Sequence, residues 1–252
     1  MDNRKYENLV LDAMHELRFF NQRLKNLSEQ ASKIVKPEKV DQNIPISLNH
    51  QVADQLRTVT EGILSLSQLF TTRLDFIEVE LNPNAIEQMD VDTVNLYGKF
   101  DKARRMLNSL SREKKVKVSL EGDKEVRRVF EAYTIIDILP YLLLDNAVKY
   151  SPENMTVDVE FTYFDNITEV KVSSFGPTVL KDELDKLTSK HYRGENAQMM
   201  ETCVGRGLGL YFVSYICDLH GINFEIKSGE ETMRLDGIPH SIFEVTLSVP
   251  WG

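Results

Sequence analysis

Residues 205–209 form a glycine-rich turn of a kind that can bind phosphate. Glycine has no Cβ, so the backbone can approach phosphate oxygens closely, and a helix that begins there offers free N–H groups and the positive end of its dipole. An apolar run follows and ends at His220 and Gly221, which predicts a helix over 208–219 with glycine after its last turn. The residues that we expect near phosphate are Gly205, Arg206, Gly207, Leu208 and Gly209.

A second candidate region lies in the apolar segment 132–150, which we predict to be helical. Asn146 and Lys149 stand three residues apart in it, so a helix would place them on one face. An amide oxygen can ligate a magnesium ion, and an ammonium group can reach a phosphate. Taken alone, the segment is also consistent with a helix rim that faces water. Because the glycine-rich turn is present as well, we predict a site for a nucleotide and its magnesium ion.

The N-terminal part has a different pattern, in which apolar residues recur at alternating steps of three and four. This spacing is typical of the seam of a coiled coil or a helical bundle. The first seam comprises Val10, Ala13, Leu17, Phe20, Leu24, Leu27, Ala31 and Ile34, and the second comprises Val52, Leu56, Val59, Ile63, Leu66 and Phe70. Pro37 ends the first run and 37–45 is a predicted loop, so the two helices would form an antiparallel hairpin.

One hairpin cannot bury both of its apolar faces, and a homodimer that forms a four-helix bundle would cover them. The alternative is that the seams pack on the C-terminal part of the chain. His15 falls outside the first seam, at a position that faces solvent. Neutral imidazole is a competent nucleophile near pH 7, so His15 is a candidate phosphoacceptor, although an ordinary surface histidine would show the same pattern.

Residues 82–84, Asn-Pro-Asn, interrupt the helical pattern and predict a boundary between a domain at 1–81 and a domain at 82–252. In the second domain we predict helices at 95–110, 132–150 and 208–219, with a kink at Pro140. Strands are predicted at 116–120, 156–164, 167–175, 222–227 and 242–249, with a hairpin turn at 165–166. The predicted fold class is α+β: a two-helix hairpin followed by an α/β sandwich with helices on one face of a mixed sheet.

Composition excludes several classes of function. The net charge of −9 argues against a general nucleic-acid binder, which needs a basic face. No run approaches the roughly 20 apolar residues that span a bilayer, and the polar start has no apolar core of a secretory signal. The two cysteines give neither a disulfide framework nor a zinc site. We therefore expect a soluble, cytoplasmic protein without a membrane span.

The two site segments, in this order and separation, resemble the N box and the G2 box of the GHKL ATPase superfamily, and more narrowly those of the catalytic domain of sensor histidine kinases. Residues 191–194 stand where that family has its F box, and 243–250 are similar to its last strand with a terminal proline. The hairpin corresponds to the family's dimerisation and phosphotransfer domain, with 14–18 similar to the start of the H box.

The resemblance implies ATP and Mg²⁺ as cofactors, with magnesium on Asn146 and the phosphates against Lys149 and the glycine-rich turn. Tyr150, Tyr192 and Arg193 are assigned to the same nucleotide site. The resemblance also implies that His15 receives the γ-phosphoryl group and that Glu16 accepts the ring proton or orients the ring. The implied partners are a second copy of the chain and a response-regulator receiver domain.

The sequence departs from the family in three places. Ser174 stands where the G1 box has an aspartate that accepts a hydrogen bond from adenine, with Gly176 kept and Thr178 in place of the second glycine. A hydroxyl can still bond the base, without charge assistance, at a loss of about 1–3 kcal/mol. Leu142 replaces a polar N-box residue, and 19–21 replace the proline-containing part of the H box.

Asp145 is close to that altered N-box position in the sequence. It would project about 100° round the helix from Asn146, so we do not expect it to substitute for the missing polar residue.

Three functions remain open on these grounds. An active histidine kinase is favoured by Asn146, Lys149 and the intact glycine-rich turn. A dimeric scaffold or sensor derived from a kinase, with weak or no nucleotide turnover, is favoured by Ser174, Leu142 and the altered H box at 19–21. A GHKL ATPase that hydrolyses nucleotide without phosphorylating itself is the third.

Overall fold

The computed structural model describes residues 21, 24–31, 50–122, 128–200 and 206–250. The chain divides into two compact units, Met1–Glu87 and Gln88–Gly252, each with its own internal packing. In the part of the chain that is described, no helix combines the length and the apolar character needed to cross a membrane.

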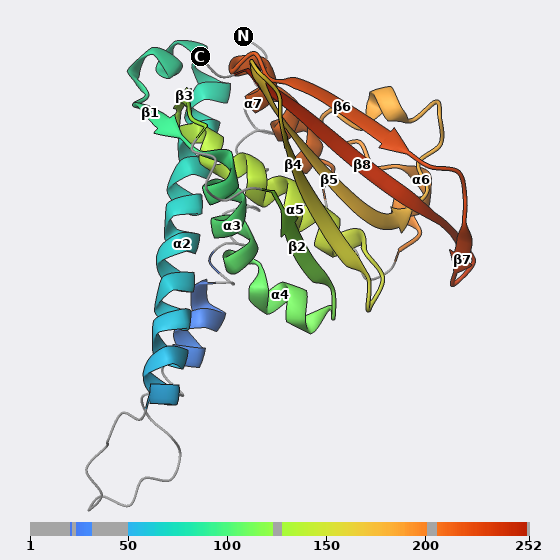
Figure 1. Cartoon of the computed structure of the whole chain (residues 1–252), viewed down its shortest axis with the longest axis horizontal. Helices are drawn as coiled ribbons and strands as arrows, with labels where there is room; N and C mark the ends of the chain where they lie inside the picture. Colours follow the sequence, from blue (N-terminus) through green and yellow to red (C-terminus); the bar gives the residue numbers. More distant parts are fainter. Residues whose placement is uncertain (1–20, 22–23, 32–49, 123–127, 201–205, 251–252) are drawn as a thin grey trace, which may run out of the picture. The chain divides into compact units, whose positions relative to one another are not determined.

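The first unit contains a helical stretch at 24–31 and the long helix α2 (His50–Leu81) (Figure 1). All six residues of the second predicted seam are partly or fully buried in α2, whereas Asp54, Arg57 and Thr58 between them are exposed. The two helical segments meet at Gly62, where an added Cβ would lie 3.5 Å from a methyl carbon of Leu27. Helix α2 ends before a proline, and the 3₁₀ helix η1 (Pro83–Gln88) follows.

The second unit is built on a six-stranded mixed sheet in the order β2-β4-β5-β8-β6, with β7 paired to the start of β8. The strands are β2 (Lys117–Glu121), β4 (Thr156–Tyr163), β5 (Ile167–Pro177), β6 (Asn223–Ser228), β7 (Met233–Leu235) and β8 (Ile238–Pro250). Only the β2–β4 pair is parallel among these described strands. The predicted hairpin of β4 and β5 is confirmed, and β8 begins at Ile238 rather than Ile242.

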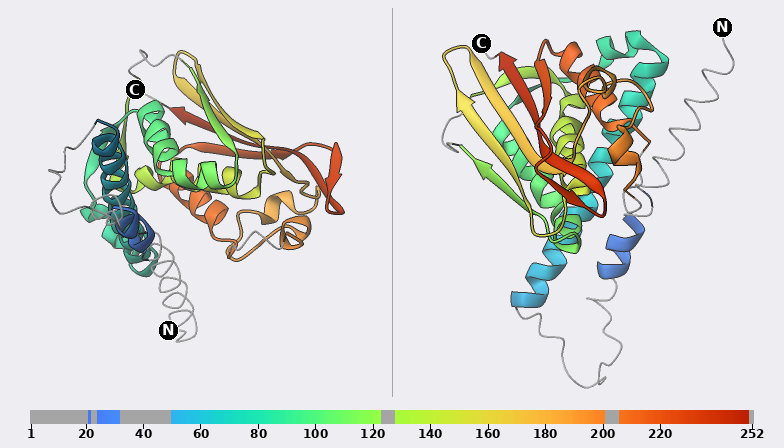
Figure 2. Two further views of the ribbon diagram at one scale, coloured as in Figure 1. Left: turned by 90° about the horizontal axis from the view of Figure 1, so that it is seen from below. Right: turned by 90° about the vertical axis from the view of Figure 1, so that its right-hand side faces the viewer.

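Helices α3 (Leu96–Met106), α5 (Ile138–Tyr150) and α7 (Gly209–Leu219) cover one face of this sheet (Figure 2). Side chains on β5 alternate accordingly: Val170 and Val172 are buried, and Lys171 between them is half-buried on the other face. Short elements complete the unit, namely α4 (Asn108–Glu113), η3 (Leu184–Lys186) and α6 (Glu195–Gln198). The predicted fold class, with helices on one face of a mixed sheet, is confirmed.

The predicted helix at 132–150 is wrong in its first part. Residues Phe130–Tyr133 form β3, which pairs antiparallel with β1 (Val91–Val94), and the 3₁₀ helix η2 (Thr134–Asp137) precedes α5. Pro140 therefore lies in the first turn of α5, where proline is tolerated, and not in the interior of a longer helix. Its missing N–H falls where a helix has no internal acceptor for that group.

The predicted helix at 95–110 is divided in two. The side chain of Asn95 caps α3 by accepting a hydrogen bond from the backbone N–H of Gly98 at 2.9 Å. Leu107, which is fully buried, separates α3 from α4. The predicted end of the helix at 208–219 is confirmed, because Gly221 has a φ of +61° after α7.

Candidate functional site

The exposed side of α5 is a narrow stripe on a helix that is otherwise buried. Leu142, Asp145, Asn146, Lys149 and Tyr150 are partly exposed, and the residues between them are buried. Steps of three and four residues place all of them on one face. The prediction that Asn146 and Lys149 share a face therefore agrees with the structure, and Leu142 lies on the same face.

Lys149 has a partner in this stripe that the sequence did not predict. Its ammonium lies 3.3 Å from Oδ2 of Asp145, one helical turn earlier. Asp145 projects away from Asn146 on the helix, but its four-residue spacing to Lys149 brings these two side chains together. A phosphate that approached Lys149 would have to share or displace this carboxylate. The ammonium of Lys114 donates to the carbonyl of Lys149 at the negative end of the helix.

Asn146 lies directly against the N-terminus of α7, so the two predicted site segments meet. A Cβ built on Gly209 would be 2.8 Å from Nδ2 and 3.1 Å from Oδ1 of Asn146, so a side chain at position 209 would force the amide to move. Gly209 is the first residue of α7, and its neighbour Leu208 is buried. The amide is thus held where the free N–H groups and dipole of α7 favour an anion.

Gly207 makes a second close approach, to the segment that resembles the F box. It has a φ of +67°, and a Cβ added there would lie 2.3 Å from the carbonyl oxygen of Tyr192. The backbone N–H of His191 donates to the carbonyl of Gly207 at 2.9 Å. Only glycine fits this position, for both its backbone angle and its space. Arg206 beside it is exposed, and Gly205 lies outside the described residues.

The end of β5 makes a third approach, to the C-terminal end of α5. A Cβ on Gly176 would be 3.4 Å from the carbonyl oxygen of Tyr150. Ser174 is buried on the same helix-facing side of β5. The hydroxyl oxygen of Thr178 is buried and has no hydrogen-bond partner among the described residues. Of these three residues, Gly176 is thus the one that directly approaches the C-terminal end of α5.

The side chains of Tyr192 and Arg193 are bonded to protein groups. The hydroxyl of Tyr192 donates to Oε1 of Glu183 at 2.9 Å, and Arg193 donates to the carbonyl of Ala197 at 2.7 Å. Burial, followed by the hydrogen bond to Glu183, raises the pKa of Tyr192 to about 12. Sequence reasoning missed Glu183, because no periodicity or motif distinguishes it from the other carboxylates of this acidic chain.

The residues present fit a magnesium ion that is held mainly by its nucleotide. The described residues contain no group of three or more histidine, cysteine, aspartate or glutamate side chains that could cage a metal. Mg²⁺ usually takes one or two protein ligands and completes its shell with phosphate oxygens and water. Asn146, which lies against the N-terminus of α7, can supply such a ligand.

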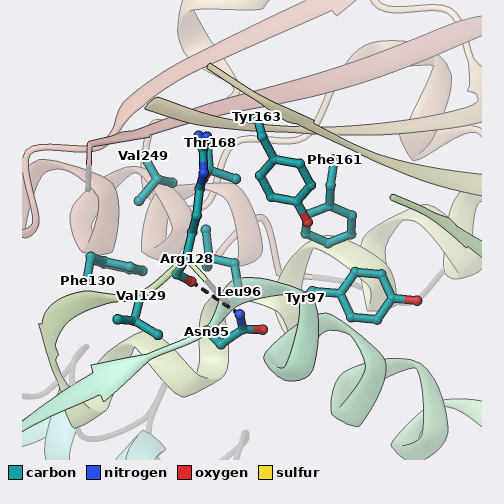
Figure 3. A pocket seen from close by; sticks show the side chains of 10 residues that line it. All are labelled: Asn95, Leu96, Tyr97, Arg128, Val129, Phe130, Phe161, Tyr163, Thr168 and Val249. Carbon is teal, nitrogen blue, oxygen red and sulfur yellow. Dashed lines mark hydrogen bonds between the residues drawn. The ribbon is translucent and has the colours of Figure 1, made fainter. Parts of the chain in front are cut away.

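A separate hollow at the other end of the sheet does not suit a nucleotide (Figure 3). It is lined by Asn95, Leu96, Tyr97, Arg128, Val129, Phe130, Phe161, Tyr163, Thr168 and Val249. The guanidinium of Arg128 stands 5.4 Å from the centre of the Tyr163 ring. The space amounts to about 10 Å³, which is room for one water molecule. It shares no residue with the site on α5 and α7.

Comparison with known proteins agrees with this arrangement. The family model described as histidine kinase-, DNA gyrase B- and HSP90-like ATPase matches residues 141–250, which include α5, the end of β5 and α7. The second unit carries a GHKL ATPase domain. The resemblance predicted from the N and G2 boxes is confirmed at this level.

The curated relatives are sensor kinases. The chain is 27% identical over 222 residues to the sensor protein QseC of Escherichia coli O157:H7, covering 87% of this chain and 44% of that protein. It is 26% identical over 226 residues to the sensor histidine kinase YkoH of Bacillus subtilis, covering 89% of this chain and 45% of that one. The chain thus spans less than half the length of these relatives.

A solved structure supports the fold. The full-length ShkA structure in complex with AMPPNP superposes with a TM-score of 0.55, at 16% identity, over 98% of this chain and 46% of that one. His15 and Glu16, the predicted phosphoacceptor and its neighbour, lie outside the described residues.

Proposed function

We propose that the chain is an ATP-dependent histidine kinase that phosphorylates itself on His15 and passes the phosphoryl group to an aspartate of a receiver domain. The observation that carries the proposal is the contact of Asn146 with Gly209. It joins a metal-ligating amide to a helix N-terminus built for phosphate. Neither group alone would suggest a nucleotide, whereas the pair suits the triphosphate of ATP and its magnesium ion.

The candidate site residues that the structure describes would bind different parts of the nucleotide and its magnesium ion. Asn146 would hold the magnesium ion, which neutralises charge on the phosphates. Lys149 and the backbone N–H groups at Gly207 and Gly209 would hold the phosphate oxygens. Ser174 would accept a hydrogen bond from the base, and as a hydroxyl it can also donate one. Selectivity for adenine would therefore be weaker than with a carboxylate at this position.

We propose that the phosphoryl group is transferred to His15 in a single displacement reaction. A ring nitrogen of His15 attacks the γ-phosphorus, a P–N bond forms, the bond from phosphorus to the β,γ-bridging oxygen breaks, and ADP leaves. Glu16 takes the proton that the attacking imidazole loses. In the second transfer, a carboxylate oxygen of the receiver aspartate bonds to phosphorus, the P–N bond breaks, and the imidazole leaves as the neutral ring by taking back the proton from Glu16. Such transfers depend mainly on positioning and charge neutralisation, which the site on α5 and α7 is suited to provide.

The relatives support this assignment at the level of the protein class. QseC and YkoH are named as sensor proteins and sensor histidine kinases, and ShkA was solved with the ATP analogue AMPPNP. We further propose that the chain acts as a homodimer through the two seams of its first unit. Because ATP is supplied inside the cell, the reaction would take place in the cytoplasm.

A kinase-derived scaffold with weak or no turnover is the second candidate. Two observations favour it: Ser174 in place of a charged acceptor, and the ion pair that already occupies Lys149. A scaffold would keep the fold and the dimer but would not transfer phosphate.

Incubation with γ-labelled ATP and magnesium separates these functions. We expect label on the wild-type chain that is lost in acid and survives base, as a P–N bond requires, and no label on the His15→Ala variant. The Asn146→Ala variant should lose both label and magnesium-dependent nucleotide binding in calorimetry. Label that is stable in acid, or that persists in His15→Ala, would rule out the proposed acceptor. Nucleotide binding without any label would favour the scaffold.

A further inference from the structure

A buried carboxylate stands beside the candidate site and is used by none of the steps above. Glu183 lies just before η3 and is only 2% exposed. Its carboxylate accepts hydrogen bonds from the backbone N–H of Leu180 at 3.0 Å, from the Tyr192 hydroxyl at 2.9 Å and from the backbone N–H of Glu195 at 2.8 Å. These donors come from two stretches of chain that are not adjacent in sequence.

In this cluster the Glu183 carboxylate is the hydrogen-bond acceptor, and its three partners are donors. All three partners donate, and an ionised carboxylate only accepts. No cationic side chain is paired with Glu183 within the described residues, so these hydrogen bonds must offset the cost of its burial. A buried acceptor with three fixed donors restrains the segments that supply them. A leucine of similar volume would fill the same space without restraining either segment.

Each of the two segments that Glu183 joins is connected to a different part of the candidate site. The stretch 191–195 carries the backbone of Tyr192, which Gly207 approaches so closely that only glycine fits. The other stretch continues β5 beyond Gly176, and Asn196 fastens it again by donating to the carbonyl of Thr178 at 2.7 Å. Packing at the junction is tight, since a Cβ on Gly194 would be 3.4 Å from Oε2 of Glu183.

We propose that Glu183 is a positioning residue for nucleotide binding. It fixes the loop 191–196, and through the contact of Tyr192 with Gly207 it fixes the turn that receives the phosphates. This inference rests on the proposed function, because it assumes that the turn binds the phosphates of ATP. Glu183 itself touches neither the nucleotide nor the acceptor.

The test compares Glu183→Gln with Asp182→Asn, which removes the same charge one residue earlier. The side chain of Asp182 is 78% exposed and pairs only loosely with Lys186, at 3.7 Å. A glutamine at position 183 can accept through its oxygen but not through its nitrogen, so at least one buried donor loses its partner. Calorimetry with magnesium and AMPPNP should show affinity weakened by about tenfold in Glu183→Gln, as for other supporting residues, and by less than about twofold in Asp182→Asn.

Two further readouts distinguish positioning from general stability. Hydrogen exchange of the backbone amides of Leu180 and Glu195 should accelerate in Glu183→Gln, while the amides of α5 and β8 keep their wild-type protection. In labelling assays KM for ATP should rise, and the rate at saturating ATP should stay near that of the wild type. A uniform loss of protection across the unit, or a lower saturating rate with unchanged KM, would overturn the inference.

The Tyr192→Phe variant covers the case in which Glu183→Gln does not fold. It removes one of the three donors and keeps the ring, so we expect the same local change in exchange and an affinity loss of about threefold, as for one hydrogen bond. If the wild type binds no nucleotide, the proposed function fails and this inference fails with it. If the wild type binds and Glu183→Gln and Tyr192→Phe bind equally well, only the role of Glu183 is disproved.

Discussion

The two ends of the candidate nucleotide site differ in what defines them: close packing around glycine residues at one end and a single side chain at the other. At the phosphate end, Gly207 is required because an added Cβ would meet backbone atoms, and Gly209 lies against the side-chain amide of Asn146. At the base end, one side chain, Ser174, stands where the family resemblance places a carboxylate. A substitution at the first end disturbs the fold of the turn, whereas a substitution at the second end changes only a hydrogen bond. The phosphate end is therefore the more reliable guide to function, and the base end is where specificity can change.

The largest effect is expected from Gly207→Ala. The new Cβ would meet the carbonyl oxygen of Tyr192 at 2.3 Å, so the turn must move. Nucleotide affinity, measured by calorimetry with magnesium and AMPPNP, should fall by about a hundredfold or more, equivalent to about 2.7 kcal/mol.

Gly221→Ala is the matched control for this change. Gly221 has a similar φ of +61°, and an added Cβ would meet nothing within 4 Å. It should lower the free energy of unfolding by about 1–2 kcal/mol, the cost of a left-handed residue other than glycine, and leave affinity unchanged. Equal affinity losses in the two variants would show that backbone strain, and not the contact with Tyr192, sets the phosphate end.

A smaller effect, in the opposite direction, is expected at the base end from Ser174→Asp. The new carboxylate would restore a charged acceptor, and a charge-assisted hydrogen bond is stronger than a neutral one. Ser174 is buried, so part of the gain is lost to desolvation. We expect ATP affinity to rise by about tenfold, with a smaller change for GTP. Unchanged or weaker ATP binding would mean that this end no longer holds adenine.

The sequence predicted the regular parts of the structure well, and the reason is periodicity. The apolar steps in α2 and the alternation in β4 and β5 depend only on neighbours along the chain. The segment 132–137 was assigned to a helix because Ala132, Ile135 and Ile136 are apolar, and all three are buried here in a strand and a 3₁₀ helix. Strand β3 has only four residues, too few for a period of two to stand out against the apolar residues that follow, and its pairing with β1 depends on residues far away in sequence.

The same distinction applies to the candidate site. The turn at Gly207 and the shared face of Asn146 and Lys149 follow from local spacing, so the sequence could predict them. The cluster around Glu183 depends on donors contributed from two stretches of chain, and Tyr192 shows no sequence signal of that role. Contacts of this kind become visible only in three dimensions.

The smallest expected effect concerns the far end of α7, whose first turn forms the phosphate end. Nε2 of His220 accepts a hydrogen bond from the backbone N–H of Tyr133 at 3.1 Å, and Nδ1 lies 2.7 Å from the carbonyl oxygen of Ile216. This arrangement needs a neutral ring with its proton on Nδ1. Burial, partly opposed by the bond to Ile216, lowers the pKa of His220 below its ordinary value of 6.5.

The sign of the resulting pH dependence follows from linkage. Below about pH 6.5 the unfolded chain binds a proton on this residue before the folded chain does, so stability falls as the pH decreases towards the folded pKa. The stabilisation of the folded chain that depends on neutral His220 is fully present above about pH 6.5. Urea unfolding at pH 8 and pH 5.5 should therefore show a larger loss of unfolding free energy in the wild type than in His220→Asn, which has no titrating group there. Nucleotide affinity at pH 8 should be similar in both. If the wild type and His220→Asn showed the same pH dependence of unfolding, His220 would not have this role. If His220→Asn bound nucleotide much more weakly than the wild type, both ends of α7 would belong to the site.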